Sequence, residues 1–369
     1  MTAAILYRDE LKEYDFGSGH PFRGDRYENF IKFLKSHASL EKYYDILAAE
    51  PATLTDLLRI CDCDYIDFNQ EYYHAASSGW VAYFEDFNHY HTLDNKPIGT
   101  PGELEGAARL IIGQAKMACD LVQAGRYKKA ISIGGGMHHA RRRFGEGFCI
   151  YNDVAFAALY LIEEYRLERI LILDTDAHAG NGTAEYIQEN PRVLFIDIHQ
   201  DPHTIYPGTG FASDIGIKNR AGMIFNIPLP LNASDASYQA AFDQIILPVA
   251  QEYKPQIIIR NGGSDPHFDD GLTNLGMTIA GFRMMGEKVR EMAEICQGKL
   301  IDLIASGYNN HVLPSAWLSL LSGIADFPAT VEEPVPVPPQ LHQDTILPET
   351  QKVLDEVKKY HHDYWHCFR

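Results

Sequence analysis

A series of short apolar runs, separated by stretches with helical periodicity, constrains the fold of this chain more than any other feature. The runs are rich in Ile, Leu and Val, and they span residues 3–7, 129–136, 169–174, 193–198, 223–229, 255–260 and 300–305. Nearly continuous hydrophobic runs of this length are typical of strands that a parallel sheet buries on both faces. They predict a three-layer α/β fold, with a mainly parallel central sheet and helices on both faces.

The stretches between and after these runs carry further signals. Residues 102–125 have apolar side chains at helical spacing, and residues 152–165 begin at Asn152, whose side chain can cap a helix. Residues 327–348 are rich in proline, which predicts an extended strap across the surface. Residues 349–369 predict a C-terminal helix that packs on the body of the protein. We expect the whole chain of 369 residues to form one domain.

Charge and composition restrict the partners. The chain has 32 Lys and Arg residues against 50 Asp and Glu residues, a formal net charge of −18. Such a surface repels nucleic acid and anionic lipid, whereas it attracts a small cationic substrate or a basic protein tail. The sequence has no apolar run long enough for a membrane span and no signal peptide. Its six scattered cysteines predict a reduced, cytoplasmic protein.

Polar side chains follow four of the predicted strands at the point where each strand ends. They lie in residues 133–139, 173–178, 260–265 and 304–309. In a parallel sheet the carboxyl ends of the strands lie at one edge, and ligands bind beyond that edge. We therefore expect these four segments to converge on one site.

Two of these segments predict a metal centre. Asp176 and His178 stand two residues apart, so their side chains project to the same side of an extended chain. Asp265, after a neighbouring strand, can supply a third ligand. Three protein ligands leave a position open for water, as in catalytic zinc sites. Iron(II) and manganese also suit this Asp-rich set, and a buried ion pair without metal is the structural alternative.

The other two segments supply groups for proton transfer and for hydrogen bonding. His138 and His139 are adjacent, and each has a candidate orienting partner, Asp174 for the first and Asn181 for the second. Histidines that transfer protons need such a partner to fix their tautomer. Tyr308 carries a phenol, which suits donation of a hydrogen bond to a developing oxyanion.

Together these motifs resemble the histone deacetylase superfamily, which has the arginase–deacetylase fold. The resemblance runs in order through residues 14–21, 147–153, 206–210 and 307–309, and so covers most of the chain. The opening and the C-terminal segment are most similar to the microbial branch, which includes acetoin-utilisation-type proteins. The resemblance implies a zinc-dependent hydrolase that releases acetate and a free amine from acetylated lysine in a protein or peptide.

The resemblance also implies roles for individual residues. The three candidate ligands would bind zinc, His139 would be the general base and acid, His138 its electrostatic partner, and Tyr308 the donor that polarises the acetyl carbonyl. The further residues that it implies are Gly147, Phe148 and Tyr206 in the substrate tunnel, Leu272 near the tunnel foot, Asp94 at the rim with Lys96 inserted close by, and Arg26 in an internal acetate channel. It implies potassium sites near Asp174, Asp176, His178 and the segment Asp197–Ile198.

This sequence departs from the family pattern at two positions. Asn181 stands where some relatives carry aspartate, so His139 lacks a carboxylate partner and is expected to be less basic. Tyr206 replaces a frequent phenylalanine of the tunnel, which adds a hydroxyl that would favour a more polar substrate.

Three other functions compete with lysine deacetylation. Hydrolysis of an acetylated polyamine, or of another small amide, needs the same chemistry and suits the acidic surface equally well. A ureohydrolase with two manganese ions needs a second set of carboxylates, which the residues after His178 do not offer. An inactive module that only binds acetyl-lysine is disfavoured, because every catalytic position is filled. A substrate preference and an oligomeric state do not follow from the sequence.

Overall fold

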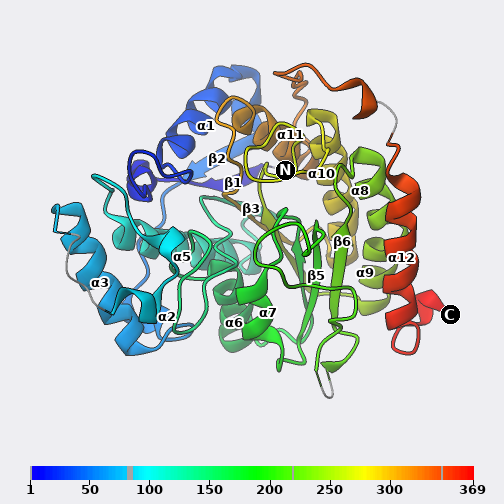
Figure 1. The fold of residues 1–369 in the computed structure, drawn as a ribbon, viewed down its shortest axis with the longest axis horizontal. Helices are drawn as coiled ribbons and strands as arrows, with labels where there is room; N and C mark the ends of the chain where they lie inside the picture. The colour runs from blue at the N-terminus through cyan, green and yellow to red at the C-terminus, as the bar shows by residue number, and fades with distance from the viewer. Residues whose placement is uncertain (1, 81–85, 218–219, 342–343) are drawn as a thin grey trace.

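Parallel strands form the centre of the structure, a computed structural model that describes residues 2–80, 86–217, 220–341 and 344–369 (Figure 1). Within these residues the sheet has eight strands in the order β2-β1-β3-β8-β7-β4-β5-β6, and every pair is parallel. The strands are β1 (Ala3–Leu6), β2 (Tyr44–Leu47), β3 (Lys129–Ile133), β4 (Ile170–Asp174), β5 (Val193–Gln200), β6 (Ile224–Leu229), β7 (Ile257–Gly262) and β8 (Leu300–Ile304).

The predicted α/β fold is confirmed, since each apolar run of the sequence overlaps a strand of this sheet. The strand β2 was not predicted. It lies at the edge of the sheet and pairs with β1 alone, and of its four residues only Tyr44 is buried. An edge strand with little burial lacks the continuous apolar run that identifies the central strands.

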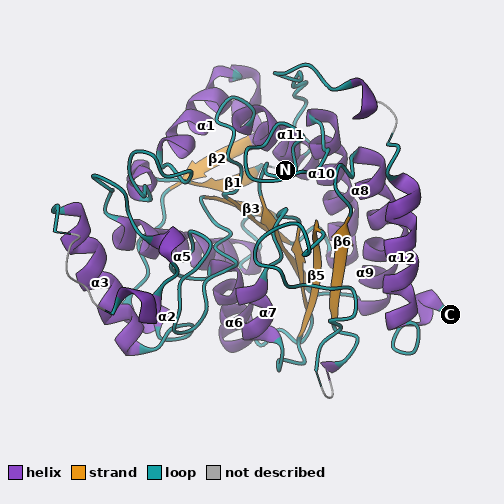
Figure 2. Cartoon of the chain, in the orientation of Figure 1, coloured by secondary structure: helices purple, strands orange, loops and turns teal. Residues whose placement is uncertain are grey.

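Helices cover both faces of the sheet, as Figures 1 and 2 show. The α-helices of the described residues are α1 (Asp25–Ser36), α2 (Leu54–Leu57), α3 (Cys63–Ser77), α4 (Phe87–Tyr90), α5 (Leu104–Gln123), α6 (Asp153–Tyr165), α7 (Asn181–Ile187), α8 (Asp235–Ala241), α9 (Leu247–Tyr253), α10 (Ile279–Ala293), α11 (Leu313–Ala325) and α12 (Leu347–His361). The side chain of Asn152 accepts a hydrogen bond from the N–H of Ala155 and so caps α6 as predicted. Within the described part of the chain, no helix is long and apolar enough to cross a membrane.

The C-terminal segment differs from the single helix that the sequence predicts for residues 349–369. The helix α12 ends at His361, and a short 3₁₀ turn follows at His366–Phe368. The chain bends between them because Trp365 is buried, and its indole N–H donates to the carbonyl oxygen of Gly222 at 2.7 Å. His361 is buried as well, and its ring stacks on Phe225 at 3.7 Å. These contacts attach the C-terminal segment to β6 and to the turn before it.

The strand order explains how distant segments meet. The strands β3, β8, β7 and β4 are neighbours in the sheet, although they are far apart in the sequence. Their carboxyl ends are level, since Ile133 pairs with Ile304, and Gly262 with Ile304, in the register of the sheet. The four polar segments of the sequence begin at these four strand ends.

Candidate metal centre

Asp176, His178 and Asp265 form a buried cluster of the kind that binds a metal ion. One ligand atom from each residue lies within 4.8 Å of the other two. The Nδ1 atom of His178 is 3.0 Å from Oδ1 of Asp176 and 3.1 Å from Oδ2 of Asp265. All three side chains are buried. The ends of β4 and β7 thus bring together the three ligands that the sequence predicts.

The backbone after β4 is not the extended chain that the sequence analysis assumed. The strand ends at Asp174, and the chain bends at residues 176–178. The N–H of Asp176 donates to Oδ1 of Asp174 at 3.1 Å, and the N–H of His178 donates to Oδ1 of Asp176 at 2.9 Å. A carboxylate that accepts from the residue two positions later turns the chain locally. The prediction that an extended chain aligns these side chains is therefore wrong beyond Asp174. The local hydrogen bonds bring Asp176 and His178 together instead.

The charges of the cluster favour a divalent cation. Burial and the neighbouring Asp176 carboxylate raise the pKa of Asp265 above its ordinary value. Burial opposes protonation of His178, but the two carboxylates outweigh it and raise the pKa of this imidazole to about 10. A proton on His178 neutralises one of the two carboxylate charges, whereas a divalent ion neutralises both. The donor set of two carboxylates and one imidazole fits zinc, iron(II) or manganese.

His138 and His139 lie next to this cluster, with their Nε2 atoms 3.1 Å apart. The Nδ1–H of His138 donates to Oδ2 of Asp174 at 2.8 Å, and the Nδ1–H of His139 donates to Oδ1 of Asn181 at 2.7 Å. The glycine run after β3 turns the chain toward the site, and Gly136 has a φ of 119° that favours glycine. These are the two pairs that the sequence predicts.

The two imidazoles differ in charge. Burial disfavours the charged form of His138, but Asp174 and Asp176 outweigh it and raise the pKa of His138 to about 9. Burial and the adjacent His138 and His178 rings lower the pKa of His139 well below that of a free imidazole. Near neutral pH, His139 is therefore the ring that can accept a proton. The order of the two pKa values agrees with the prediction from sequence.

We expect Asn181→Asp to move the acid limb of the pH–rate profile to higher pH. A carboxylate facing the Nδ1–H of His139 would favour the imidazolium form and raise the pKa of His139. A general base must be neutral, so activity disappears as the pH falls through this pKa, and a raised pKa brings that loss at a higher pH. Profiles of kcat/KM against pH for both proteins measure the shift. An acid limb that stays in place would show that another group controls it.

A cavity of about 380 Å³ lies beside the cluster, and His139, His178 and Tyr308 are among its lining residues. The same lining contains the whole predicted tunnel and rim set, Gly147, Phe148, Tyr206, Leu272 and Asp94. Tyr206 is 40% exposed and Leu272 41%, so both reach the surface. The phenol ring of Tyr308 packs edge-on against His178, with a ring separation of 6.5 Å.

A tight turn from Glu146 to Cys149 forms one wall of this cavity. The two central residues, Gly147 and Phe148, have φ values of 59° and 66°. The N–H of Cys149 donates to the carbonyl oxygen of Glu146 at 3.0 Å, as in a type I′ turn. A Cβ atom at Gly147 would stand 2.2 Å from Cδ2 of His139. The wall can lie against this imidazole only because the residue is glycine.

Asp94 reaches the same cavity despite the insertion beside it. Its Oδ2 accepts a hydrogen bond from the N–H of Gly147 at 2.9 Å. Its Oδ1 is buried and has no partner among the described residues.

Arg26 lies behind Tyr308, with the guanidinium carbon 5.4 Å from the centre of the phenol ring. It is buried, and it donates to the carbonyl oxygens of Ala305 and Gly307 at 3.1 and 2.9 Å. Its role in an acetate channel stays a prediction.

Asp197 is also buried, and its carboxylate already has protein partners. Its Oδ1 is 2.8 Å from Nδ1 of His199, and its Oδ2 accepts from the N–H of Gly180 at 2.8 Å. The potassium sites expected near this residue and near Asp174, Asp176 and His178 stay a prediction.

Glu146 is a residue of the site that the sequence analysis missed. Its side chain is largely buried, and its Oε1 accepts from Nδ2 of Asn181 at 2.9 Å and from Nε of Arg141 at 2.7 Å. Its Oε2 accepts from the hydroxyl of Tyr206 at 3.0 Å. One carboxylate thus contacts both the tunnel wall and the residue that orients a histidine. The signal available in the sequence was its place directly before the tunnel glycine.

Known proteins resemble this chain over most of its length. Residues 20–324 match the histone deacetylase domain family. The chain is 30% identical to a protein of Archaeoglobus fulgidus named probable deacetylase, over 100% of both chains. It is 32% identical over 327 residues to the acetoin utilization protein AcuC of Staphylococcus aureus, which covers 88% of this chain and 82% of that protein.

A solved structure shows the same fold. The crystal structure of the HDA15 HD domain superposes with a TM-score of 0.82 and covers 100% of this chain and 97% of that chain, at 23% sequence identity. The fold, the buried Asp-His-Asp cluster and the match over residues 20–324 agree with one another. The chain therefore belongs to the histone deacetylase domain family.

Proposed function

We propose that this chain is a zinc-dependent deacetylase that hydrolyses the acetamide of N-acetyl-lysine, or of a similar acylated amine, to acetate and a free amine. One observation carries the proposal: a single cavity of about 380 Å³ is lined by a metal-site residue, His178, by the imidazole of His139 and by the phenol of Tyr308. A linear amide that enters this cavity would meet all three groups. Membership of a deacetylase family supports the same reaction.

Asp176, His178 and Asp265 would hold the zinc ion. When bound there, the ion would polarise the amide carbonyl and lower the pKa of a water molecule. The same ligands would also accept iron(II) or manganese, and analysis of the purified protein distinguishes them.

The side chains around the amide would transfer the protons and stabilise the oxyanion. His139 accepts the proton of the attacking water at Nε2, because its Nδ1–H is engaged by Asn181. It then delivers this proton to the leaving amine. His138, charged beside Asp174, stabilises negative charge next to it. Burial raises the pKa of Tyr308 well above that of free tyrosine, so its hydroxyl keeps the proton that it donates to the oxyanion.

We expect Tyr308→Phe to lower kcat by about 10²- to 10³-fold and to change KM far less. The substitution removes a hydroxyl that acts mainly in the transition state and keeps the ring that packs on His178 and Phe148. Steady-state kinetics on an acetylated peptide measure both constants. A loss of less than about threefold would mean that another group holds the oxyanion.

The cavity wall supports a substrate with an alkyl chain. Phe148 and Leu272 offer apolar surface, and the hydroxyl of Tyr206 is engaged by Glu146. The methylene groups of a lysine side chain fit such a lining, because burial of apolar surface is favourable and no polar group is stranded.

An acetylated polyamine is the second candidate, and the acidic side chain of Asp94 at the cavity suits it as well as a peptide. The carboxylate of Asp94, which belongs to the cavity lining, would pair with a backbone N–H of a peptide or with an ammonium group of a polyamine. The net charge of −18 attracts both classes.

A substrate panel decides between these candidates. We expect kcat/KM to be higher for acetyl-lysine peptides than for N-acetylspermidine or N-acetylputrescine. A preference of about tenfold or more for the polyamines would overturn the assignment to lysine and leave deacetylation standing. Failure to release acetate from any of these substrates would overturn the proposed function.

A further inference from the structure

We propose that Glu146 is a positioning residue that sets the tautomer of His139 through the side-chain amide of Asn181. The inference rests on the proposed function, in which His139 accepts a proton at Nε2. It deepens that function by assigning a role to a carboxylate outside the Asp-His-Asp cluster.

The side-chain amide of Asn181 contacts a different residue at each of its two ends. Its Oδ1 lies 2.7 Å from Nδ1 of His139, and its Nδ2 lies 2.9 Å from Oε1 of Glu146. An ionised carboxylate only accepts hydrogen bonds, whereas an amide presents a donor at one end and an acceptor at the other. Glu146 therefore requires the NH₂ group of Asn181 on its side. The carbonyl oxygen of Asn181 must then face His139.

This orientation leaves one productive tautomer. A carbonyl oxygen facing Nδ1 requires a hydrogen on Nδ1, so Nε2 of His139 keeps its lone pair. If the amide were reversed, its NH₂ group would donate to Nδ1, and the hydrogen would move to Nε2. An imidazole with a hydrogen on Nε2 cannot accept a proton there. Asn181 alone fits either arrangement, and the carboxylate of Glu146 selects the one with the hydrogen on Nδ1. The charged His138, whose Nε2 lies 3.1 Å from Nε2 of His139, favours the same tautomer from the opposite side of the ring.

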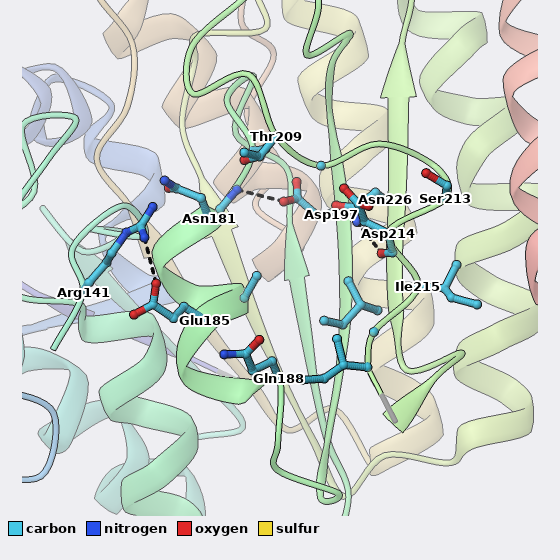
Figure 3. A pocket seen from close by; sticks show the side chains of 17 residues that line it. Arg141, Asn181, Glu185, Gln188, Asp197, Thr209, Ser213, Asp214, Ile215 and Asn226 are labelled. Carbon is cyan, nitrogen blue, oxygen red and sulfur yellow. Dashed lines mark hydrogen bonds and ion pairs between the residues drawn. The ribbon is translucent and has the colours of Figure 1, made fainter. Parts of the chain in front are cut away.

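The carboxylate is itself held in place. Nε of Arg141 donates to Oε1 of Glu146 at 2.7 Å, and the hydroxyl of Tyr206 donates to Oε2 at 3.0 Å. Nη1 of Arg141 also donates to Oε2 of Glu185 on α7 at 2.8 Å, a contact that Figure 3 shows. Asn181 stands at the first turn of the same helix. Each oxygen of the Glu146 carboxylate thus has a donor besides Asn181, and these bonds hold it beside the Asn181 amide.

The arrangement explains how the site works with asparagine at this position. An aspartate at 181 would accept from Nδ1 of His139 in either rotamer, and would need no further support. Asparagine adds no charge beside the imidazole but has two orientations, so it needs a group that selects one. Glu146 selects the orientation of the Asn181 amide, and so acts on His139 through Asn181.

The first test is Glu146→Met, which keeps the length of the side chain and removes the acceptor. We expect kcat to fall about 10-fold or more, the size of effect typical of groups that orient an active-site histidine. We expect KM to change by less than about twofold, because the wrong tautomer reduces the share of competent enzyme and leaves binding intact. Asp363→Ala, which removes a carboxylate that is 93% exposed, is the control and should leave kcat unchanged. A change in KM alone would assign Glu146 to the tunnel wall and overturn the proposal.

Glu146→Gln is the conservative rescue. Arg141 requires an acceptor at the position of Oε1, so glutamine places its carbonyl oxygen there and still accepts from Asn181. We therefore expect Glu146→Gln to retain most of the wild-type kcat. A Gln variant as impaired as the Met variant would show that charge, and not the accepted hydrogen bond, matters.

A double-mutant cycle with Asn181→Asp distinguishes a role of Glu146 in orienting the Asn181 amide from a purely structural role. In the Asn181→Asp background the histidine partner accepts from Nδ1 in any rotamer, so Glu146→Met should cost little. In this background Glu146→Met should even raise kcat, because it removes a carboxylate that faces the new aspartate. Equal losses in both backgrounds would overturn the proposal. If Glu146→Met does not fold, Glu146→Ala replaces it in the same cycle and must show the same coupling.

The tautomer can also be observed without any activity. In protein labelled with ¹⁵N-histidine, the His139 signals, assigned through their loss in His139→Ala, should show hydrogen on Nδ1 and none on Nε2. Glu146→Met should add the reversed tautomer, and an unchanged spectrum would contradict the inference. An inactive wild-type protein would refute the proposed function while this readout still tests the role of Glu146.

Discussion

Asp265→Ala is expected to empty the metal centre and to lower kcat/KM by at least about 10³-fold, because metal polarisation of the amide is worth several kcal/mol and each 1.4 kcal/mol is tenfold. Asp265 supplies one of only two carboxylates in the cluster. Metal analysis of the purified variant should find little ion, whereas the wild-type chain should carry close to one ion.

Thermal unfolding gives a second readout for the same variant. A ligand that binds only the folded state raises stability, by about 2.7 kcal/mol at a concentration 100 times its Kd. Added zinc should raise the Tm of the wild-type protein and leave that of Asp265→Ala unchanged. Asp363→Ala is the charge control, since the side chain of Asp363 is 93% exposed. A variant that still binds one ion tightly would remove Asp265 from the ligand set.

His139→Ala should be nearly inactive, while His138→Ala should keep measurable activity with a shifted pH optimum. A general base contributes about 10²- to 10⁴-fold, and the lowered pKa of His139 keeps it neutral and ready to accept a proton. His138, with its pKa raised to about 9, would act through its charge. Its loss leaves Asp174 with the hydrogen bond that Nδ2 of Asn261 donates at 2.8 Å.

Profiles of kcat against pH for both variants make the comparison. The two proteins should first be shown to bind equal amounts of metal, so that a loss of the ion is not mistaken for a loss of the base. If His138→Ala loses more activity than His139→Ala, the general base is His138 and the proposed roles are wrong.

The strands of this fold were predictable where burial is complete. Every residue of β5 is buried, and its apolar run was visible in the sequence. The edge strand β2 was missed because three of its four residues are partly or fully exposed. The order of the strands was not predictable, because β8 and β7 lie between β3 and β4 in the sheet although both come much later in the chain. Such long-range pairing leaves no local pattern.

Some residues of the candidate site were also predictable from the sequence, and others were not. Asp176 and Asp265 were found because each follows a buried strand closely, and strand ends converge in a parallel sheet. Glu146 follows no strand, and its contacts come from separate segments, including Tyr206, which lies 60 residues later. Its importance depends on which end of the Asn181 amide faces it, and that is a property of three-dimensional contacts alone.

The most direct test of metal-dependent deacetylation is acetate release from an acetyl-lysine peptide while zinc is titrated into metal-depleted protein. We expect no acetate without metal, and a rate that rises with zinc and levels off at one ion per chain. Acetate release that persists without metal, or that requires a second ion per chain, would contradict this expectation.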